Sequence, residues 1–293
     1  MKLGLHIAAT EWQGGPSRLG ATLAEVVQTA EAAGFDMIDV ADHLWQHPIM
    51  GGPETSQIEA YTTLGYIAAH TRRVRLMSLA TAASYRPAGL LAKMVTTLDV
   101  LSGGRAMLGI GAGDYPEEAQ GLGLSFPPLG ERFDILAETV QACLRMWEGE
   151  HGDERPFHGR YVQMERPLNV PQSLSRPHPP ILIAGSGERR TLPLVARYAD
   201  ACNIRPSPEI PRQLELLRKL CEQEGRDYEA IEKTAPFGFD VGADGSKAGE
   251  VINQLRWLAG MGIQTVLGWV VGVDQITPIE IMGREVISAV AEL

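Results

Sequence analysis

The feature that most constrains the fold is a repeating order of segments along the chain. A short aliphatic or β-branched run is followed by a glycine-containing or polar loop, and then by a longer segment with apolar residues every three or four positions. This is the pattern of a strand, a loop and an amphipathic helix. The predicted strands are residues 2–8, 35–41, 74–81, 105–113, 180–186, 200–204, 232–241 and 263–271. Helices are predicted at residues 59–71, 88–101, 131–147, 188–199, 208–224, 246–260 and 277–292.

The predicted strands read as nearly continuous apolar runs, which suits parallel strands covered on both faces. Eight strand–helix units in 293 residues favour an α/β fold, a (β/α)8 TIM barrel, over a doubly wound open sheet. Because the fifth and sixth strands are short, a seven-unit or open sheet is the alternative. Residues 149–178 interrupt the repeat with several prolines, so we expect an insertion with one hairpin in a single barrel domain over 1–293.

The first helix shows local signals for both of its ends. Leu23, Val26, Val27 and Ala30 have helical spacing, and Thr22 and Glu25 have the spacing of a capping box. Gly34 follows the last apolar position, as expected of a glycine that ends a helix.

Charge and cysteine content exclude several classes of protein. The net charge is −10 and the basic residues are scattered, which argues against nucleic-acid binding, since that requires clustered Lys and Arg. The three cysteines are far apart, so there is no C-x-x-C metal motif and no even disulfide framework, as suits a reducing cytoplasm. The N-terminus lacks a signal-peptide pattern, and no run approaches the roughly 18 apolar residues of a membrane span. We therefore expect a cytoplasmic protein.

In a TIM barrel, the functional residues lie at the carboxyl ends of the strands and in the loops that follow. This rule selects mainly polar and glycine residues along the chain. The candidates are Glu11, Trp12, Asp42, His43, Trp45, His47, Ser78, Thr81, Tyr85, Arg86, Gly111, Gly113, Asp114, Gly185, Ser186, Gly187, Arg189, Arg190 and Asn203.

The stretch "ADHLWQHP" (41–48) contains two histidines and an aspartate. A metal site would use His43 and His47 on one helical face with Asp42, but Pro48 disfavours helix at His47. Packing is a stronger alternative, because Asp42 could hold the loop through backbone N–H groups. His43 follows a strand end, so we predict that it is a hydrogen-bonding or proton-transfer residue in the barrel mouth.

Two glycine-rich stretches suggest a cofactor. In "ILIAGSGERRTL" a buried strand leads through Gly185, Ser186 and Gly187 to a helix start with two arginines, the form of a phosphate site. The alternative is a tight turn with its arginines in solvent. "LGIGAGDYPEE" lacks the immediate helix of a dinucleotide-binding fingerprint. Its glycines instead suggest a flat ring lying against the backbone.

Several ordered motifs resemble the luciferase-like monooxygenase superfamily, especially its branch that uses the deazaflavin coenzyme F420. They are "GFDMIDVADHLW", "VRLMSLATAASYRPAGLLAKMVTTLDVLSGGRAMLGIGAG", "RFDILAETV" and "PPILIAGSGERRTLPLVARYADACN". The resemblance covers roughly residues 2–205. It implies a TIM barrel, a ring cofactor in the barrel mouth, a homodimer and a strained, often cis, peptide after the third strand. That peptide is expected at Ser78-Leu79, with Ala80-Thr81 as the alternative.

The resemblance also implies roles for residues of this chain. His43 corresponds to the family's histidine near the reactive ring carbon or substrate, with Glu11 or Asp114 as further catalytic candidates. The cofactor-binding residues would be Asp42, Ser78, Leu79, Ala112, Gly113, Gly185, Ser186, Gly187 and Arg189. There is no clear match for the Lys and Arg residues with which sugar-phosphate-oxidising members hold their substrate.

The implied activity is hydride transfer between coenzyme F420 and a small organic substrate. An FMN-dependent monooxygenase, a non-catalytic flavin-binding barrel and, more remotely, a metal-dependent hydrolase are the alternatives.

Overall fold

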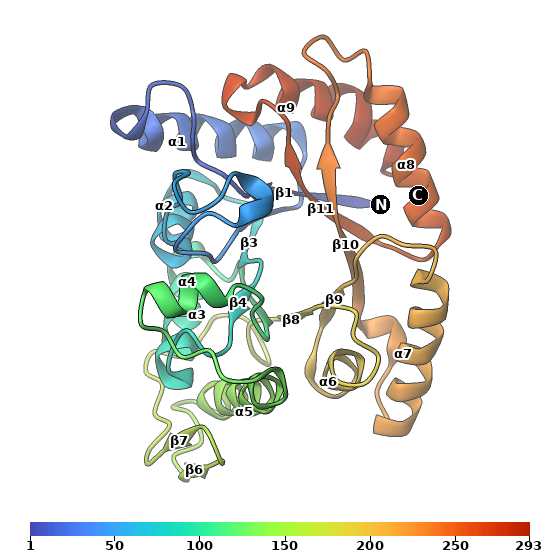
Figure 1. The fold of residues 1–293 in the computed structure, drawn as a ribbon. Coiled ribbons are helices and arrows are strands. Elements are labelled where there is room, and N and C mark those ends of the chain that lie inside the picture. The colour runs from blue at the N-terminus through green and yellow to red at the C-terminus, as the bar shows by residue number, and fades with distance from the viewer.

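A computed structural model describes residues 1–293, and a closed ring of parallel strands lies at its centre (Figure 1). The strands of the ring are β1 (Lys2–Ile7), β2 (Met37–Val40), β3 (Arg75–Ser78), β5 (Ala106–Gly111), β8 (Ile181–Ala184), β9 (Ala201–Asn203), β10 (Glu232–Phe239) and β11 (Thr265–Val270). Pairing of β1 with β11 and of β3 with β5 closes the ring. The predicted (β/α)8 TIM barrel is therefore confirmed, and the open-sheet alternative is wrong. A two-residue strand, β4 (Thr81–Ala82), also pairs with β5.

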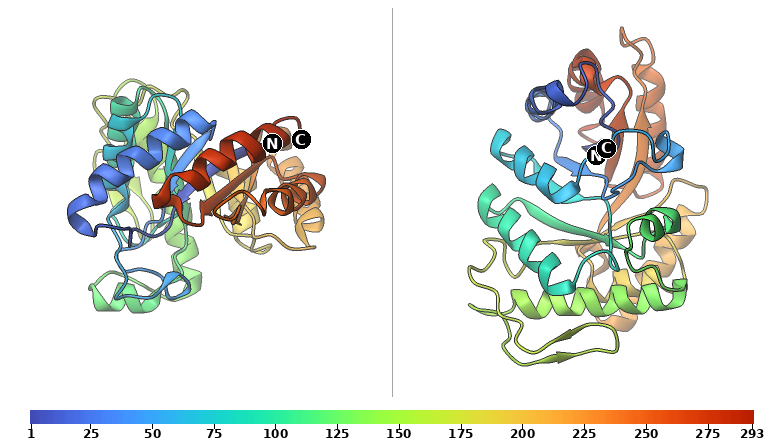
Figure 2. Two further views of the ribbon diagram at one scale, coloured as in Figure 1. Left: turned by 90° about the horizontal axis from the view of Figure 1, so that it is seen from above. Right: turned by 60° about the vertical axis from the view of Figure 1, so that its left-hand side comes forward.

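Helices surround the strands on the outside, as two further views show (Figure 2). They are α1 (Pro16–Ala33), α2 (Ala60–His70), α3 (Ala88–Ser102), α5 (Leu129–Trp147), α6 (Thr191–Tyr198), α7 (Ile210–Glu224), α8 (Ala248–Gly260) and α9 (Thr277–Ile281). The last unit continues through a π-helical segment, Met282–Ile287, into α10 (Ser288–Val290). A short helix, α4 (Pro116–Gly121), follows β5. No helix combines the length and the apolar character that crossing a membrane requires.

Of the two predicted ends of helix α1, the structure confirms only the C-terminal one. Gly34 has φ 101° and its N–H reaches the carbonyls of the last turn, as predicted. The predicted capping box at the start of the helix is wrong, because Thr22 and Glu25 lie inside the helix. The helix begins at Pro16, since proline lacks an N–H and its fixed φ suits the first helical turn.

The hairpin predicted within residues 149–178 is present. Strands β6 (Phe157–His158) and β7 (Gln163–Met164) pair antiparallel, outside α5 in Figure 1. This segment is separate from the ring of barrel strands.

Inside the ring, apolar side chains close the barrel between its two ends. The closed layer consists of Met37, Met77, Met107, Leu182, Ala201 and Leu267, and each of them is at most 3% exposed. Toward the amino ends of the strands, the Arg75 guanidinium pairs with Asp36 at 2.5 Å and Glu232 at 2.8 Å. Solvent and small molecules therefore enter from the carboxyl ends of the strands, which form the mouth.

Candidate active site

The chain leaves β3 through a cis peptide between Leu79 and Ala80. The predicted Ser78-Leu79 bond and the alternative Ala80-Thr81 bond are both wrong, although the bulge lies where the resemblance places it. Ser78 still pairs with Val40 of β2, and the Leu79 N–H donates to the Val40 carbonyl at 2.8 Å. The peptide before Leu79 is therefore ordinary strand, and the turn comes one bond later.

Gly109 of β5 makes room for this bulge. A Cβ atom at position 109 would lie 1.9 Å from the Ser78 carbonyl oxygen, well inside contact distance. The Ser78 hydroxyl donates to the Gly109 carbonyl at 3.2 Å. A glycine in β5 and the bulge after β3 thus depend on each other.

Behind the bulge, Asp42 is held in a buried polar network. Arg86 donates to both carboxylate oxygens, at 2.6 and 2.9 Å, and the Thr81 hydroxyl donates to one of them at 2.7 Å. Arg86 also pairs with Glu59 at 2.8 Å, and Glu59 accepts from the Thr62 N–H at the start of α2. The Asp42 side chain is therefore engaged within the protein, where it braces the loop after β2.

His43 is anchored by a carboxylate that the sequence analysis missed. Its Nδ1 lies 3.3 Å from Oε2 of Glu118, a fully buried residue of α4. The other oxygen, Oε1, accepts from the backbone N–H groups of Leu44 at 2.5 Å and Trp45 at 2.9 Å. The Tyr85 hydroxyl donates to Oε2 at 2.5 Å. One carboxylate thus ties together the loops after β2, β3 and β5.

This pairing changes the ionisation of both partners. Burial alone would raise the pKa of Glu118, but hydrogen bonds from His43, Tyr85 and two backbone N–H groups hold that pKa below its ordinary value. Burial alone would lower the pKa of His43, but Glu118 outweighs it and raises that pKa, with smaller contributions from Asp114 and Asp42. Because ionised Glu118 can only accept hydrogen bonds, Nδ1 of His43 carries a proton, and Nε2 is the atom free to exchange one.

The other two catalytic candidates differ in their surroundings. Asp114 follows β5, is exposed, and lies near enough to His43 to raise its pKa. Glu11 is also exposed but makes no hydrogen bond or ion pair with any site residue. The structure therefore associates Asp114, and not Glu11, with the electrostatics of His43.

The glycine-rich end of β5 presents its backbone closely to its neighbours. Gly113 has φ 77°, and a Cβ atom there would lie 2.9 Å from Cβ of Ala82. The Arg132 guanidinium donates to the carbonyls of Gly113 at 2.5 Å and Ala112 at 3.3 Å. Hydrogen bonds from α5 thus stabilise the conformation of this strand end.

The predicted phosphate turn lies between β8 and α6. Gly185 has φ 113°, and none of the backbone N–H groups of residues 186–190 donates to an acceptor in the protein. Arg190 is engaged by the Gly130 carbonyl at 3.1 Å and by Asp134 at 3.3 Å. Arg189 is exposed and has no ion-pair partner, so it is the free cation of this turn.

Aromatic rings fill the rest of the loop after β2. The centroid of the His43 ring lies 5.4 Å from that of His47 and 5.9 Å from that of Tyr115. A Cβ atom at Gly121 would lie 2.1 Å from the Trp45 ring, which shows that the indole packs directly on α4. No group of three or more His, Cys, Asp or Glu side chains has the geometry to hold a metal ion.

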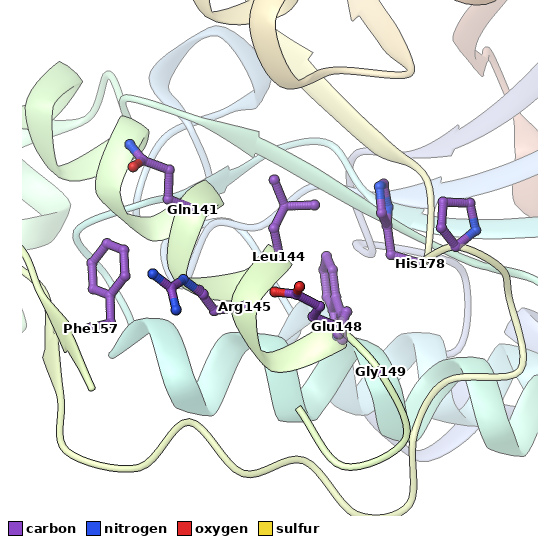
Figure 3. A pocket seen from close by; sticks show the side chains of 9 residues that line it. Gln141, Leu144, Arg145, Glu148, Gly149, Phe157 and His178 are labelled. Carbon is purple, nitrogen blue, oxygen red and sulfur yellow. The ribbon is translucent and has the colours of Figure 1, made fainter. Parts of the chain in front are cut away.

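A separate hollow of about 480 Å³ lies outside the barrel, between the C-terminal turns of α5 and the insertion (Figure 3). Gln141, Leu144, Arg145 and Glu148 line it from one side and His178 from another. None of its lining residues is a predicted site residue. The candidate active site is therefore the mouth and not this hollow.

A sequence model of the family described as luciferase-like monooxygenase matches residues 1–274. The chain belongs to this family. Among its relatives is a protein of Nakamurella multipartita named F420-dependent glucose-6-phosphate dehydrogenase, 31% identical over 248 residues, which are 82% of this chain and 68% of the relative. A protein of the same name from Kineococcus radiotolerans is 30% identical over 262 residues, with 85% and 70% covered. These relationships identify the chain as an oxidoreductase enzyme.

Solved structures show the same fold at lower sequence identity. An F420-dependent secondary alcohol dehydrogenase in complex with an F420–acetone adduct has a TM-score of 0.81 at 18% identity, with 98% of each chain covered. The monooxygenase RslO1 from Streptomyces bottropensis has a TM-score of 0.80 at 19% identity, with 98% of this chain and 99% of that chain covered. At these identities the likeness concerns the fold alone.

Proposed function

We propose that this oxidoreductase transfers hydride between the deazaflavin coenzyme F420 and a small organic substrate. Relatives at 30–31% identity are named as F420-dependent dehydrogenases. The observation that carries the proposal is the His43–Glu118 pair, which holds an imidazole with one free nitrogen at the end of β2. Bound F420 would supply the hydride-accepting or hydride-donating ring carbon.

The wall of the mouth fits a flat ring. A Cβ atom at Gly111 would lie 3.8 Å from Cβ of Ala184 and 4.0 Å from Cβ of Ala80, so small side chains from β5, β8 and the bulge meet there. Ala112 and Gly113 follow directly after the end of β5 and continue this surface. A planar ring can approach the backbone where no large side chain stands in front of it. Leu79, Ala80, Gly111, Ala112, Gly113 and Ala184 would hold the ring.

The turn before α6 fits the anionic part of the cofactor. The N–H groups of residues 186–190 have no acceptor in the protein, and the start of a helix attracts anions. Arg189 adds an unpaired positive charge. Glu188 in the same turn is neutralised by Arg212. Gly185, Ser186, Gly187 and Arg189 would therefore hold the cofactor phosphate.

His43 would handle the proton that accompanies hydride transfer. Oxidation of an alcohol requires loss of the hydroxyl proton, which an unprotonated Nε2 accepts. Reduction of a carbonyl requires the reverse transfer from a protonated Nε2. Glu118 and Tyr85 position His43 and do not themselves need to contact the substrate. Asp114, close to the same imidazole, is the second candidate for proton transfer.

Cofactor titration tests the proposal directly. We expect quenching of tryptophan fluorescence at micromolar F420 and none with FMN at the same concentrations. Micromolar FMN binding without F420 binding would instead favour the monooxygenase. The phosphate assignment predicts that Arg189→Ala weakens F420 binding about tenfold, as for loss of one charge-assisted contact. Arg256→Ala, at an exposed position on α8, is the matched control.

Substitution of His43 separates catalysis from binding. His43→Gln should abolish turnover while it leaves F420 affinity within about twofold, because proton transfer contributes roughly 10²–10⁴-fold to rate. His47→Gln in the same loop is the control and should retain turnover. Unchanged turnover in His43→Gln would remove this histidine from the mechanism.

A further inference from the structure

A second histidine–carboxylate pair lies inside the barrel. His6 of β1 and Asp39 of β2 are partners in the strand register, and Nδ1 of His6 is hydrogen-bonded to Oδ1 of Asp39. Their chain neighbours, such as Leu5 and Ile38, belong to the core between strands and helices. Since side chains alternate along a strand, His6 and Asp39 point into the barrel.

The pair lies on the mouth side of the closed apolar layer. Asp39 is two residues nearer the carboxyl end of β2 than Met37, which belongs to that layer. The Asp39 side chain is fully buried, whereas the His6 side chain is 16% exposed. Because the layer closes the barrel below, the exposed edge of the imidazole faces the mouth.

Burial of this pair costs folding free energy. Burial raises the pKa of Asp39, and the electrostatic interaction and hydrogen bond with His6 oppose this only in part. The second oxygen, Oδ2, is buried without any hydrogen-bond partner, and no Lys or Arg pairs with the carboxylate. Apolar side chains at these two positions would avoid the desolvation cost. Retention of a costly polar pair in a barrel interior is typical of a functional site.

The chemistry of the pair defines what it can bind. The Asp39 carboxylate accepts the proton of Nδ1 and so orients the ring, which leaves Nε2 at the exposed edge. A neutral imidazole accepts a hydrogen bond from a hydroxyl at Nε2, and a protonated one donates to a carbonyl oxygen. Because a carboxylate lies next to it and no cationic side chain supports it, the pair disfavours a phosphate or carboxylate ligand.

We propose that His6, oriented by Asp39, binds a neutral hydroxyl or carbonyl oxygen of a molecule held at the floor of the mouth. The proposal rests on the proposed function only in that it places the ligand in the mouth. His6 is distinct from His43, which follows β2 and is anchored by Glu118. A bound molecule would thus meet one imidazole at the rim and another at the floor. The neutral oxygen could belong to the cofactor ring or to the substrate, and the two sources are separable.

Substitution of His6 distinguishes these sources. His6→Phe keeps a planar ring and removes the hydrogen bond, whose loss should weaken binding about tenfold. If the oxygen is the cofactor's, the F420 dissociation constant rises about tenfold. If it is the substrate's, KM rises about tenfold while F420 affinity is unchanged. Changes below about twofold in both, in a variant with the circular-dichroism spectrum of the wild type, would overturn the proposal. His158→Phe, at an exposed position in the hairpin, is the control.

Histidine ring resonances provide a readout that does not depend on turnover. In wild-type protein labelled with ¹⁵N-histidine, His6 should show a protonated Nδ1 and an Nε2 whose shift moves when F420, or F420 with substrate, is added. Asp39→Asn should change the tautomer without ligand. The proposal is wrong if His6 in the wild type carries its proton on Nε2 alone. It is also wrong if the His6 resonance does not shift when any ligand of the mouth is added. If F420 does not bind, the proposed function fails, and the same His6 signal is then followed with FMN.

Discussion

Glu118→Gln should lower the pKa of His43 and shift the pH dependence of catalysis. Glutamine keeps the shape of the side chain, and its amide oxygen can still accept hydrogen bonds from the backbone N–H groups of Leu44 and Trp45. The negative charge that stabilises protonated His43 is lost, and burial of the imidazole then favours its neutral form. The loop is thereby preserved while the ionisation of one ring changes.

The size of the shift follows from the geometry. The two atoms are 3.3 Å apart, and unit charges at that separation interact by about 5 kcal/mol at an effective dielectric constant near 20. Each charge is spread over two atoms and the His43 side chain is 23% exposed, so solvent screening reduces this value. We expect a loss of about 1.4–2.8 kcal/mol, which is roughly one to two pKa units.

Nuclear magnetic resonance measures this shift without a cofactor. Histidine ring signals are titrated between about pH 4 and pH 9, and His43 is assigned from the spectrum of His43→Gln. In kinetic assays, the inflection of kcat/KM assigned to His43 should move to lower pH by the same amount. Glu117→Gln, at an exposed position of the same helix, should leave the pKa unchanged. An unaltered His43 pKa in Glu118→Gln would refute the electrostatic account.

The same pair makes folding stability depend on pH in a defined window. The raised pKa of His43 gives stability that is complete below its ordinary value of 6.5 and is lost as pH rises through the folded-state value. The lowered pKa of Glu118 gives stability that is present above its ordinary value of 4.5 and is lost as pH falls through the folded-state value. The contribution of the pair is therefore largest between these two values. Urea unfolding of wild type and Glu118→Gln should differ most there.

Two further substitutions test the bulge and the network behind it. Gly109→Ala should destabilise the fold by about 1–3 kcal/mol, since its Cβ would meet the Ser78 carbonyl at 1.9 Å; Gly249→Ala, at a helical position with open space, should stabilise by up to about 1 kcal/mol. Equal unfolding midpoints for these two variants would show that the bulge yields to the added methyl group. Arg86→Met should cost about 3–5 kcal/mol because Asp42 is left as a buried unpaired charge, and Asp42→Asn in that background should recover part of the loss. Urea denaturation measures each effect, and additive losses in the double variant would contradict the pairing.

Local patterns in the sequence were sufficient to predict the barrel and the position of His43. Buried parallel strands carry apolar residues on both faces, so each strand is visible without knowledge of its neighbours. Glu118 was not recognised, because "YPEE" resembles an exposed helix start and nothing local shows that the second glutamate turns inward. Its partners lie 33 to 75 positions earlier in the chain, so its role depends on tertiary packing.

The His6–Asp39 pair had a sequence signal that was overlooked. Each residue is a polar position in a short apolar strand, in "KLGLHIA" and "MIDV" respectively. Their pairing depends on the register of β1 against β2, which periodicity does not supply. The cis peptide lies one bond from its predicted position for a related reason: contact with β2 determines the last paired residue of β3.

The methionines beneath the mouth have a consequence for how this enzyme can change over evolutionary time. Met37, Met77 and Met107 come from three neighbouring strands and share one buried layer. Unbranched thioether side chains adapt their shape more readily than branched ones. When a substitution in the mouth alters the volume available to a ligand, these methionines can therefore change conformation to fit it, and the outer core does not need to repack. The floor of this barrel gives the lineage room to acquire new substrates while the fold remains intact.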